Sequence, residues 1–191
     1  MNSTVRYFFL GLAVLVLAAC SPEAFRGRDI SGVQWGGDFE LVAHTGTRVK
    51  SSDFRGKVLV VFFGYTNCPD ICAPTLVQLA QALRQLGDDA GRVQVVLVTV
   101  DPKRDTPAQL ARFVSNFHPS FIGLTGSTPE IAAVAKEYRV PFDSHAHAGQ
   151  HIAHSATILV KDSHGKLRLL FRDASVPEDI AHDLRLLLKQ G

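Results

Sequence analysis

The chain has 191 residues, of which 46% are hydrophobic and 20% charged, and its formal net charge is +2. A chain of this length and apolar content can bury one ordinary core, so we expect a single folded domain. Because the net charge is small and the basic residues are scattered, the sequence lacks the basic surface typical of nucleic-acid-binding proteins, and nucleic acid is not an expected partner.

The first 19 residues are typical of an export signal. Arg6 and the α-amino group form a positive end, and residues 7–19 are uncharged and mostly apolar. A transmembrane anchor is the alternative, but this stretch has 13 residues, whereas a spanning helix needs about 20. The Leu-Ala-Ala sequence before Cys20 resembles a bacterial lipoprotein box. This resemblance implies that Cys20 becomes the acylated first residue of the mature protein.

The segment that follows Cys20 is predicted to be a flexible tether. It is poor in large apolar residues and is interrupted by Pro22, Gly27, Gly32, Gly36 and Gly37. The sequence therefore divides into a signal peptide over residues 1–19, a tether over residues 20–37 and a folded domain over residues 38–191.

Strand and helix patterns alternate through the folded domain, which predicts the α/β class. A hairpin is expected around His44-Thr45-Gly46. After it come an apolar run over residues 57–63 and a helix with leucines spaced by three and four residues, Leu76, Leu79, Leu83 and Leu86. The remaining expected elements, in chain order, are a strand over 93–100, a helix over 107–117, a strand near 121–124, a helix over 129–138, strands over 156–160 and 166–171, and a helix over 177–189. The continuous apolar runs indicate strands that are covered on both faces.

Two cysteines lie directly after the first long strand, in the segment GYTNCPDIC. With Cys20 assigned to the lipid, Cys68 and Cys72 are the only thiols of a domain that faces an oxidising compartment, so they form a pair by default. A cysteine motif at the end of the first long strand predicts a thioredoxin-like fold, in which a sulfur at the start of a helix favours the thiolate form, here at Cys68.

Pro74 complicates the local structure, because it disfavours a helical residue before it and removes a backbone hydrogen bond. We therefore expect a distorted turn between the cysteines, with regular helix only from Pro74 onward. The spacing of the cysteines alone leaves three interpretations open: a structural disulfide, a redox couple and two ligands of a metal site.

His154 is the candidate third donor, because it immediately precedes the strand expected near residue 156. In a thioredoxin-like fold the loop entering that strand packs beside the cysteine motif. Oxidoreductases of that fold usually have a cis-proline there, whereas this chain has no proline between Pro141 and Pro177. Two thiolates and an imidazole suit copper and are compatible with zinc. The alternative is that His154 is an ordinary hydrogen-bonded histidine at a strand end.

From about residue 39 to the C-terminus the chain resembles the Sco/SenC family, thioredoxin-like copper proteins that help assemble the dinuclear copper centre of cytochrome oxidase. The resemblance rests on FRGKVLVVFFGYTNCPDIC, VTVDPKRDTPAQL and HIAHSATILV, in this order. It implies that Cys68, Cys72 and His154 bind one copper ion, as Cu(I) or Cu(II), and that the cysteines can also form a disulfide. Two positions depart from the common family pattern: Ala73 replaces a proline after the second cysteine, and Ala153 replaces an aspartate before the histidine.

The resemblance also implies the architecture and the partners. The expected fold is a thioredoxin-like α/β domain with a central mixed sheet flanked by helices and an N-terminal hairpin extension. The expected partners are the copper-bearing subunit of cytochrome c oxidase, the membrane through the lipid on Cys20, and a periplasmic copper donor or thiol reductant.

Two further groups of polar residues have ordinary structural explanations. Asp101 resembles an acidic family residue near the metal loop, but Asp101-Pro102 also suits a strand-ending turn, and Thr106 or Asp105 before Pro107 suits a helix N-cap. We do not count Asp101 as a ligand. The histidines His145, His147 and His151 are expected in a solvated loop, with weak copper capture as the alternative.

Two functions of different classes fit these features. The first is a membrane-anchored copper metallochaperone, which is not an enzyme. The second is a thiol-disulfide oxidoreductase that keeps the copper-binding cysteines of the oxidase reduced. Both need Cys68 and Cys72, and only the first needs His154. A peroxidatic thiol enzyme is disfavoured, because such enzymes usually have a threonine three residues before the reactive cysteine, where this chain has Tyr65.

Overall fold

The computed structural model describes residues 23–141, 157–172 and 176–191, and the structural statements below concern these residues. They form one eight-stranded mixed sheet with the strand order β1-β8-β7-β4-β5-β6-β2-β3. The strands are β1 (Arg28–Asp29), β2 (Glu40–Ala43), β3 (Arg48–Lys50), β4 (Val58–Gly64), β5 (Val93–Thr99), β6 (Ile122–Thr125), β7 (Ile158–Lys161) and β8 (Leu167–Phe171). The helices are α2 (Cys72–Leu86), α3 (Pro107–Val114), α4 (Thr128–Glu137) and α5 (Pro177–Gln190), with short 3-10 helices η1 (Ser51–Phe54) and η2 (Gly87–Arg92).

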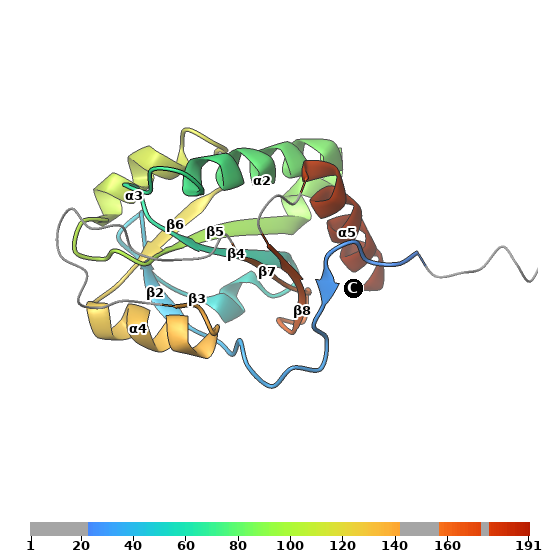
Figure 1. Cartoon of the computed structure of the whole chain (residues 1–191), viewed down its shortest axis with the longest axis horizontal. Helices are drawn as coiled ribbons and strands as arrows, with labels where there is room; N and C mark the ends of the chain where they lie inside the picture. Colours follow the sequence, from blue (N-terminus) through green and yellow to red (C-terminus); the bar gives the residue numbers. More distant parts are fainter. Residues whose placement is uncertain (1–22, 142–156, 173–175) are drawn as a thin grey trace, which may run out of the picture.

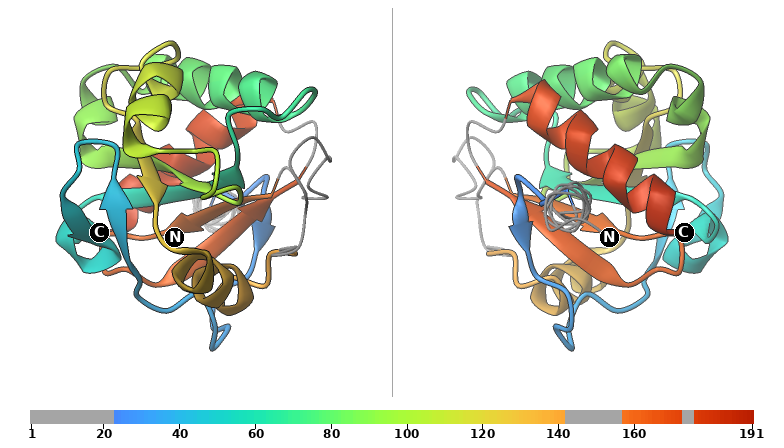
Figure 2. Two further views of the ribbon diagram at one scale, coloured as in Figure 1. Left: turned by 90° about the vertical axis from the view of Figure 1, so that its left-hand side faces the viewer. Right: turned by 90° about the vertical axis from the view of Figure 1, so that its right-hand side faces the viewer.

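The centre of the sheet is the parallel pair β4 and β5, in which all seven residues of each strand are buried. Both faces of these strands are covered, since α2 and α5 lie on one face and α4 lies on the other (Figure 1). Figure 2 shows the same layers from two sides, with α2 above the sheet and α4 below it. This burial on both faces explains why β4 and β5 are almost entirely apolar, with Gln94 and Thr99 as the polar exceptions in β5.

The architecture confirms the predicted thioredoxin-like α/β fold. The expected hairpin is present, since β2 pairs with β3 and also with β6, so the hairpin extends the sheet. The helix α2 begins at Cys72, two residues earlier than expected from Pro74. Pro74 is tolerated because the first N–H groups of a helix have no acceptor within it. The expected turn between the cysteines is therefore retained, but it ends at the second cysteine.

The described part of the expected tether packs against the domain. Strand β1 pairs with β8 at the sheet edge (Figure 2), and the backbone N–H groups of Arg26 and Gly27 donate to the buried carboxylate of Asp183 at 2.9 and 2.7 Å. Four partly buried apolar side chains of this segment contact the core: Phe25, Ile30, Val33 and Trp35. Each stands alone among polar residues and glycines, so composition alone predicts a flexible segment.

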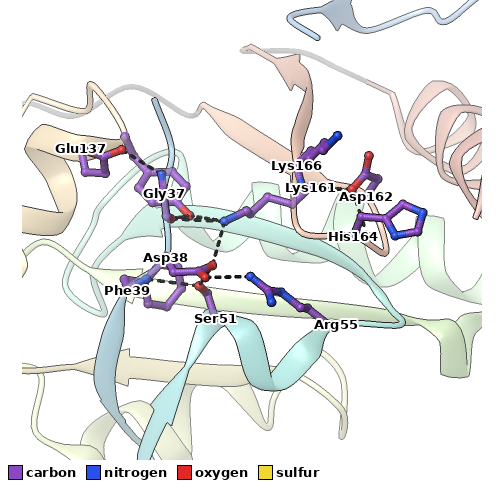
Figure 3. Close-up of polar contacts among 11 residues, drawn as sticks. Gly37, Asp38, Phe39, Ser51, Arg55, Glu137, Lys161, Asp162, His164 and Lys166 are labelled. Carbon is purple, nitrogen blue, oxygen red and sulfur yellow. Dashed lines mark hydrogen bonds and ion pairs between the residues drawn. The ribbon is translucent and has the colours of Figure 1, made fainter. Parts of the chain in front are cut away.

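A buried lysine fixes the end of this segment. The side chain of Lys161, in β7, is 1% exposed, and its Nζ donates to the carbonyl of Gly37 and to the hydroxyl of Tyr138, both at 3.2 Å. The carboxylate of Asp38 lies 3.6 Å from the same Nζ (Figure 3). Burial lowers the pKa of Lys161, and the charge of Asp38 opposes that shift. The network ties the N-terminal segment to β7 and to the end of α4.

In the described ranges, every helix falls short of the length and hydrophobicity required to cross a bilayer.

Candidate metal centre

The structure brings Cys68 and Cys72 together at the start of α2. Cys72 is the first residue of the helix and is fully buried, whereas Cys68 lies in the preceding turn and is partly exposed. The backbone N–H of Cys72 donates to the Sγ atom of Cys68 at 3.3 Å. Both residues are held as thiols rather than as a disulfide. The first amide of the helix therefore points at the more accessible sulfur.

The two sulfurs differ in their surroundings. Burial raises the pKa of the Cys72 thiol far above its usual range, and the hydrogen bond with Cys68 acts in the same direction. A proton on Cys72 must therefore leave when a metal ion binds there. Cys68 is the more exposed of the two sulfurs.

Gly64 makes room for the inner sulfur. It is the last residue of β4, and a Cβ built on it would lie 2.8 Å from the Sγ atom of Cys72 and 3.1 Å from the ring of Phe62. Any larger residue would push the sulfur out of its position. The sequence motifs do not include Gly64 among the site residues, although a glycine in a strand is a signal of close approach by another group.

Asp105 fixes the turn that carries Cys68, and we predicted only a capping role for it. Its carboxylate is fully buried and accepts hydrogen bonds from the N–H of Thr66 at 3.1 Å, the hydroxyl of Thr66 at 2.6 Å and the hydroxyl of Thr99 at 2.6 Å. Burial raises the pKa of Asp105, and these hydrogen bonds oppose the shift. The carboxylate thus joins the end of β5 to the residue two before Cys68.

The neighbouring Asp101 has the structural role that the sequence suggested. It is buried in the turn that follows β5, where its carbonyl accepts a hydrogen bond from the N–H of Arg104 at 3.1 Å. Its carboxylate accepts another from the guanidinium of Arg104, which lies 5.9 Å from the centroid of the Tyr65 ring. Thr106, rather than Asp105, is the N-cap of α3, since its hydroxyl accepts from the N–H of Gln109 at 3.2 Å.

Several predicted site residues lie outside the described residues: Cys20, His145, His147, His151 and His154. Within the described ranges, no three His, Cys, Asp or Glu side chains cluster closely enough to hold a metal ion. The register of the sheet pairs Phe62 of β4 with Ile158 of β7. Strand β7, the next strand after His154 in the sequence, therefore lies beside β4, the strand that precedes Cys68.

The chain is similar to proteins of known family. The family model described as SCO1/SenC matches residues 28–189. A SCO2-like protein of Rickettsia conorii is 32% identical over 185 residues, which cover 92% of this chain and 90% of that relative. The mitochondrial SCO2 homolog of Bos taurus is 47% identical over 110 residues, which are 56% of this chain and 41% of the bovine protein. The match thus spans less than half of the bovine relative's length.

A solved structure carries the same fold. The structure of Bradyrhizobium japonicum ScoI with copper bound has 37% sequence identity and a TM-score of 0.72, and the match covers 79% of this chain and 98% of ScoI. The fold and the cysteine pair define a thioredoxin-like domain with a dithiol at the start of its first long helix. The extent of the family match then shows that the chain belongs to the SCO1/SenC family, which confirms the resemblance seen in its motifs.

Proposed function

We propose that this protein is a copper metallochaperone. It binds one copper ion through Cys68, Cys72 and His154 and passes the ion to the copper-bearing subunit of cytochrome c oxidase. The observation that carries this proposal is the adjacent dithiol, with the N–H of Cys72 donating to the sulfur of Cys68, in a chain 37% identical to a ScoI solved with copper bound.

The two cysteines and the histidine are suitable ligands for a copper ion. Two thiolates provide soft ligands for Cu(I), and an added imidazole nitrogen provides the further donor that Cu(II) favours. The partly exposed Cys68 supports ligand exchange with a partner, while the buried Cys72 keeps one sulfur out of solvent. An open, low-coordination site of this kind releases its metal ion without turning over a substrate.

A thiol-disulfide oxidoreductase is the second candidate, favoured by the same pair of sulfurs. The Cys68 thiolate would attack a disulfide of the partner, forming a mixed disulfide and releasing one partner thiolate. Cys72, after losing its proton, would then attack Cys68 and release the second partner thiolate. The partner disulfide gains two electrons, and the Cys68–Cys72 dithiol loses two. This route does not use His154.

His154→Ala separates the two candidates. We expect the variant to keep part of its Cu(I) affinity, because two thiolates satisfy that ion, and to lose most Cu(II) binding together with the thiolate charge-transfer absorption. It should still cycle between dithiol and disulfide. In cells that lack the protein and grow on limiting copper, the variant should fail to restore the copper content of the oxidase.

The matched control is a variant with His145, His147 and His151 all changed to alanine, which should show at most slower copper loading. If His154→Ala restores the oxidase as well as the parent does, while Cys68→Ser fails, the reductase replaces the chaperone as the function of this protein.

We also propose that an acylated Cys20 holds the mature protein at a bacterial membrane facing the periplasm or the cell exterior. Acyl chains on one cysteine give stable membrane association. The parent should therefore sediment with membranes, and Cys20→Ser should be released or left unprocessed. Fractionation combined with mass analysis of the N-terminal peptide measures this, and a soluble parent with an unmodified Cys20 would rule out the anchor.

A further inference from the structure

A pocket of about 540 Å³ lies on the face of the sheet that carries α4. Its floor includes Leu159 of β7 and Leu170 of β8, which are paired across the two strands. The N-terminal segment forms one wall with Ile30, Val33 and Trp35. The remaining wall is the end of α4 and the residues just after it, so the pocket exists only because the N-terminal segment packs against the domain.

The described residues that line this pocket carry charge of one sign. Among them are three with guanidinium groups, Arg28, Arg139 and Arg172, and none with a carboxylate. Within the described ranges, neither Arg28 nor Arg139 forms an ion pair with a carboxylate, whereas the nearby Arg168 pairs with Asp162. A basic rim around apolar walls suits a ligand that has both a carboxylate and an apolar body.

The backbone at Arg139 is a second, independent sign of a binding role. Arg139 has a φ of 55° and is the only residue other than glycine with a positive φ in the described ranges. It closes α4 in a Schellman arrangement, in which the N–H of Val140 donates to the carbonyl of Ala135 at 2.8 Å and the N–H of Arg139 donates to that of Lys136 at 3.1 Å. Glycine normally occupies this position, because a left-handed backbone is unfavourable for a residue with a Cβ.

The arginine side chain makes contacts that glycine would lack. Its guanidinium carbon lies 5.0 Å from the centroid of the Trp35 ring, at the wall of the pocket. The strained backbone thus holds a cation against the indole. A strained residue in a pocket, with a less strained alternative available, indicates that its side chain serves a purpose other than folding.

Two of the residues that line the pocket, Thr157 and Arg172, lie at the same end of the sheet as the cysteine pair. Arg28 is paired with Leu170, Phe171 with Ile158, and Ile158 with Phe62, two residues before the end of β4. The cysteines lie on the α2 face of that end, and the pocket lies on the α4 face. A protein that docks against this end of the domain can contact both.

We propose that this pocket binds an acidic, partly apolar segment of the protein with which the domain exchanges copper, an inference that rests on the proposed function. Carboxylates of the segment pair with Arg28 and Arg139, and an apolar side chain packs on Trp35 and the leucines below it. A membrane surface fits less well, because lipid headgroups would meet the arginines without filling a pocket walled by tryptophan, isoleucine, valine and leucine.

Trp35 provides a direct assay, since it is the single tryptophan of the chain. The reduced, copper-free protein is titrated with an eight-residue peptide of alternating glutamate and leucine while the tryptophan emission is recorded. We expect a saturable change that weakens with added salt. Arg139→Gly should weaken peptide binding by about tenfold or more, since a charge-assisted contact is lost. The same variant should keep its Tm or gain about 2 to 4 °C through relief of backbone strain.

Arg28→Glu should weaken peptide binding as strongly as Arg139→Gly does. The matched control is Arg84→Glu on α2, which makes the same charge change away from the pocket and should leave peptide binding unchanged. His154→Ala should also bind the peptide as the parent does, so a failure of copper binding and a failure of peptide binding are observed separately.

Three outcomes would overturn the proposal. The first is equal binding of a peptide with glutamine in place of glutamate, because carboxylates would then not be recognised. The second is a change in Trp35 emission with phosphatidylglycerol vesicles, but not with phosphatidylcholine vesicles or the acidic peptide, which would assign the pocket to the membrane. The third is the absence of any change with either probe.

Discussion

Oxidation of Cys68 and Cys72 to a disulfide is expected to abolish copper binding while the fold persists. Copper needs both sulfurs as thiolates, and a disulfide removes both at once. The two sulfurs are already adjacent in the structure, since the first amide of α2 donates to Cys68 and Cys72 is the residue that carries it. Forming the bond therefore requires only local adjustment of the turn. Anaerobic copper titration of the oxidised and reduced proteins, with the disulfide verified by mass, measures the effect.

The matched control is Cys20→Ser, which leaves Cys68 and Cys72 as the only cysteines and so fixes the identity of the disulfide. Reduction of the same sample should restore one copper ion per chain. Stoichiometric copper in the verified disulfide form would mean that the metal site does not use these two sulfurs, and the proposal that Cys68 and Cys72 bind copper would fail.

Asp105→Ala is expected to weaken copper binding by about 10- to 100-fold, the usual range for residues that support metal ligands from outside the first coordination sphere. The variant removes the acceptor that holds the N–H and hydroxyl of Thr66 and the hydroxyl of Thr99. The turn that carries Cys68 then loses its attachment to β5. We expect the free energy of unfolding to fall by about 2 to 4 kcal/mol, because buried donors are left without partners. Competition with a colorimetric Cu(I) chelator and urea unfolding measure the two effects.

Asp105→Asn tests whether the loss follows from the hydrogen bonds rather than from a cavity. It keeps the shape of the side chain and one acceptor oxygen, so its copper affinity should fall between those of the parent and Asp105→Ala. The exposed Asp88 in η2 offers the control, since Asp88→Asn should change neither quantity. Should both Asp105 variants lose stability and keep full copper affinity, the residue would support only the fold.

Local sequence patterns specified the types of most elements. The continuous apolar runs around Val60 and Val96 predicted the two central strands, because strands covered on both faces have no polar face to alternate. Leucines spaced by three and four residues predicted α2, and Thr106 before Pro107 predicted the start of α3. The cysteine count predicted that Cys68 and Cys72 form a pair, but their spacing could not distinguish a disulfide from a metal site.

The tertiary structure decided which distant residues support that pair. Asp105 reaches Thr66 across 39 positions of sequence, and Lys161 reaches Gly37 across 124. Neither contact has a local signature, because an aspartate before a helix and a lysine at a strand end are common on protein surfaces.

Local sequence patterns also fail to predict the packing of the N-terminal segment and the pocket beside it. The apolar side chains of the segment stand singly among polar residues, so no periodicity predicts that they pack. The basic pocket forms only where this segment meets α4 and the sheet. The sequence by itself determined the α/β class, the cysteine pair and the family motifs, because these depend on spacings of a few residues. Only the tertiary structure decided the supporting carboxylate, the buried lysine and the basic pocket, because each depends on chain segments far apart in sequence that meet only in the folded state.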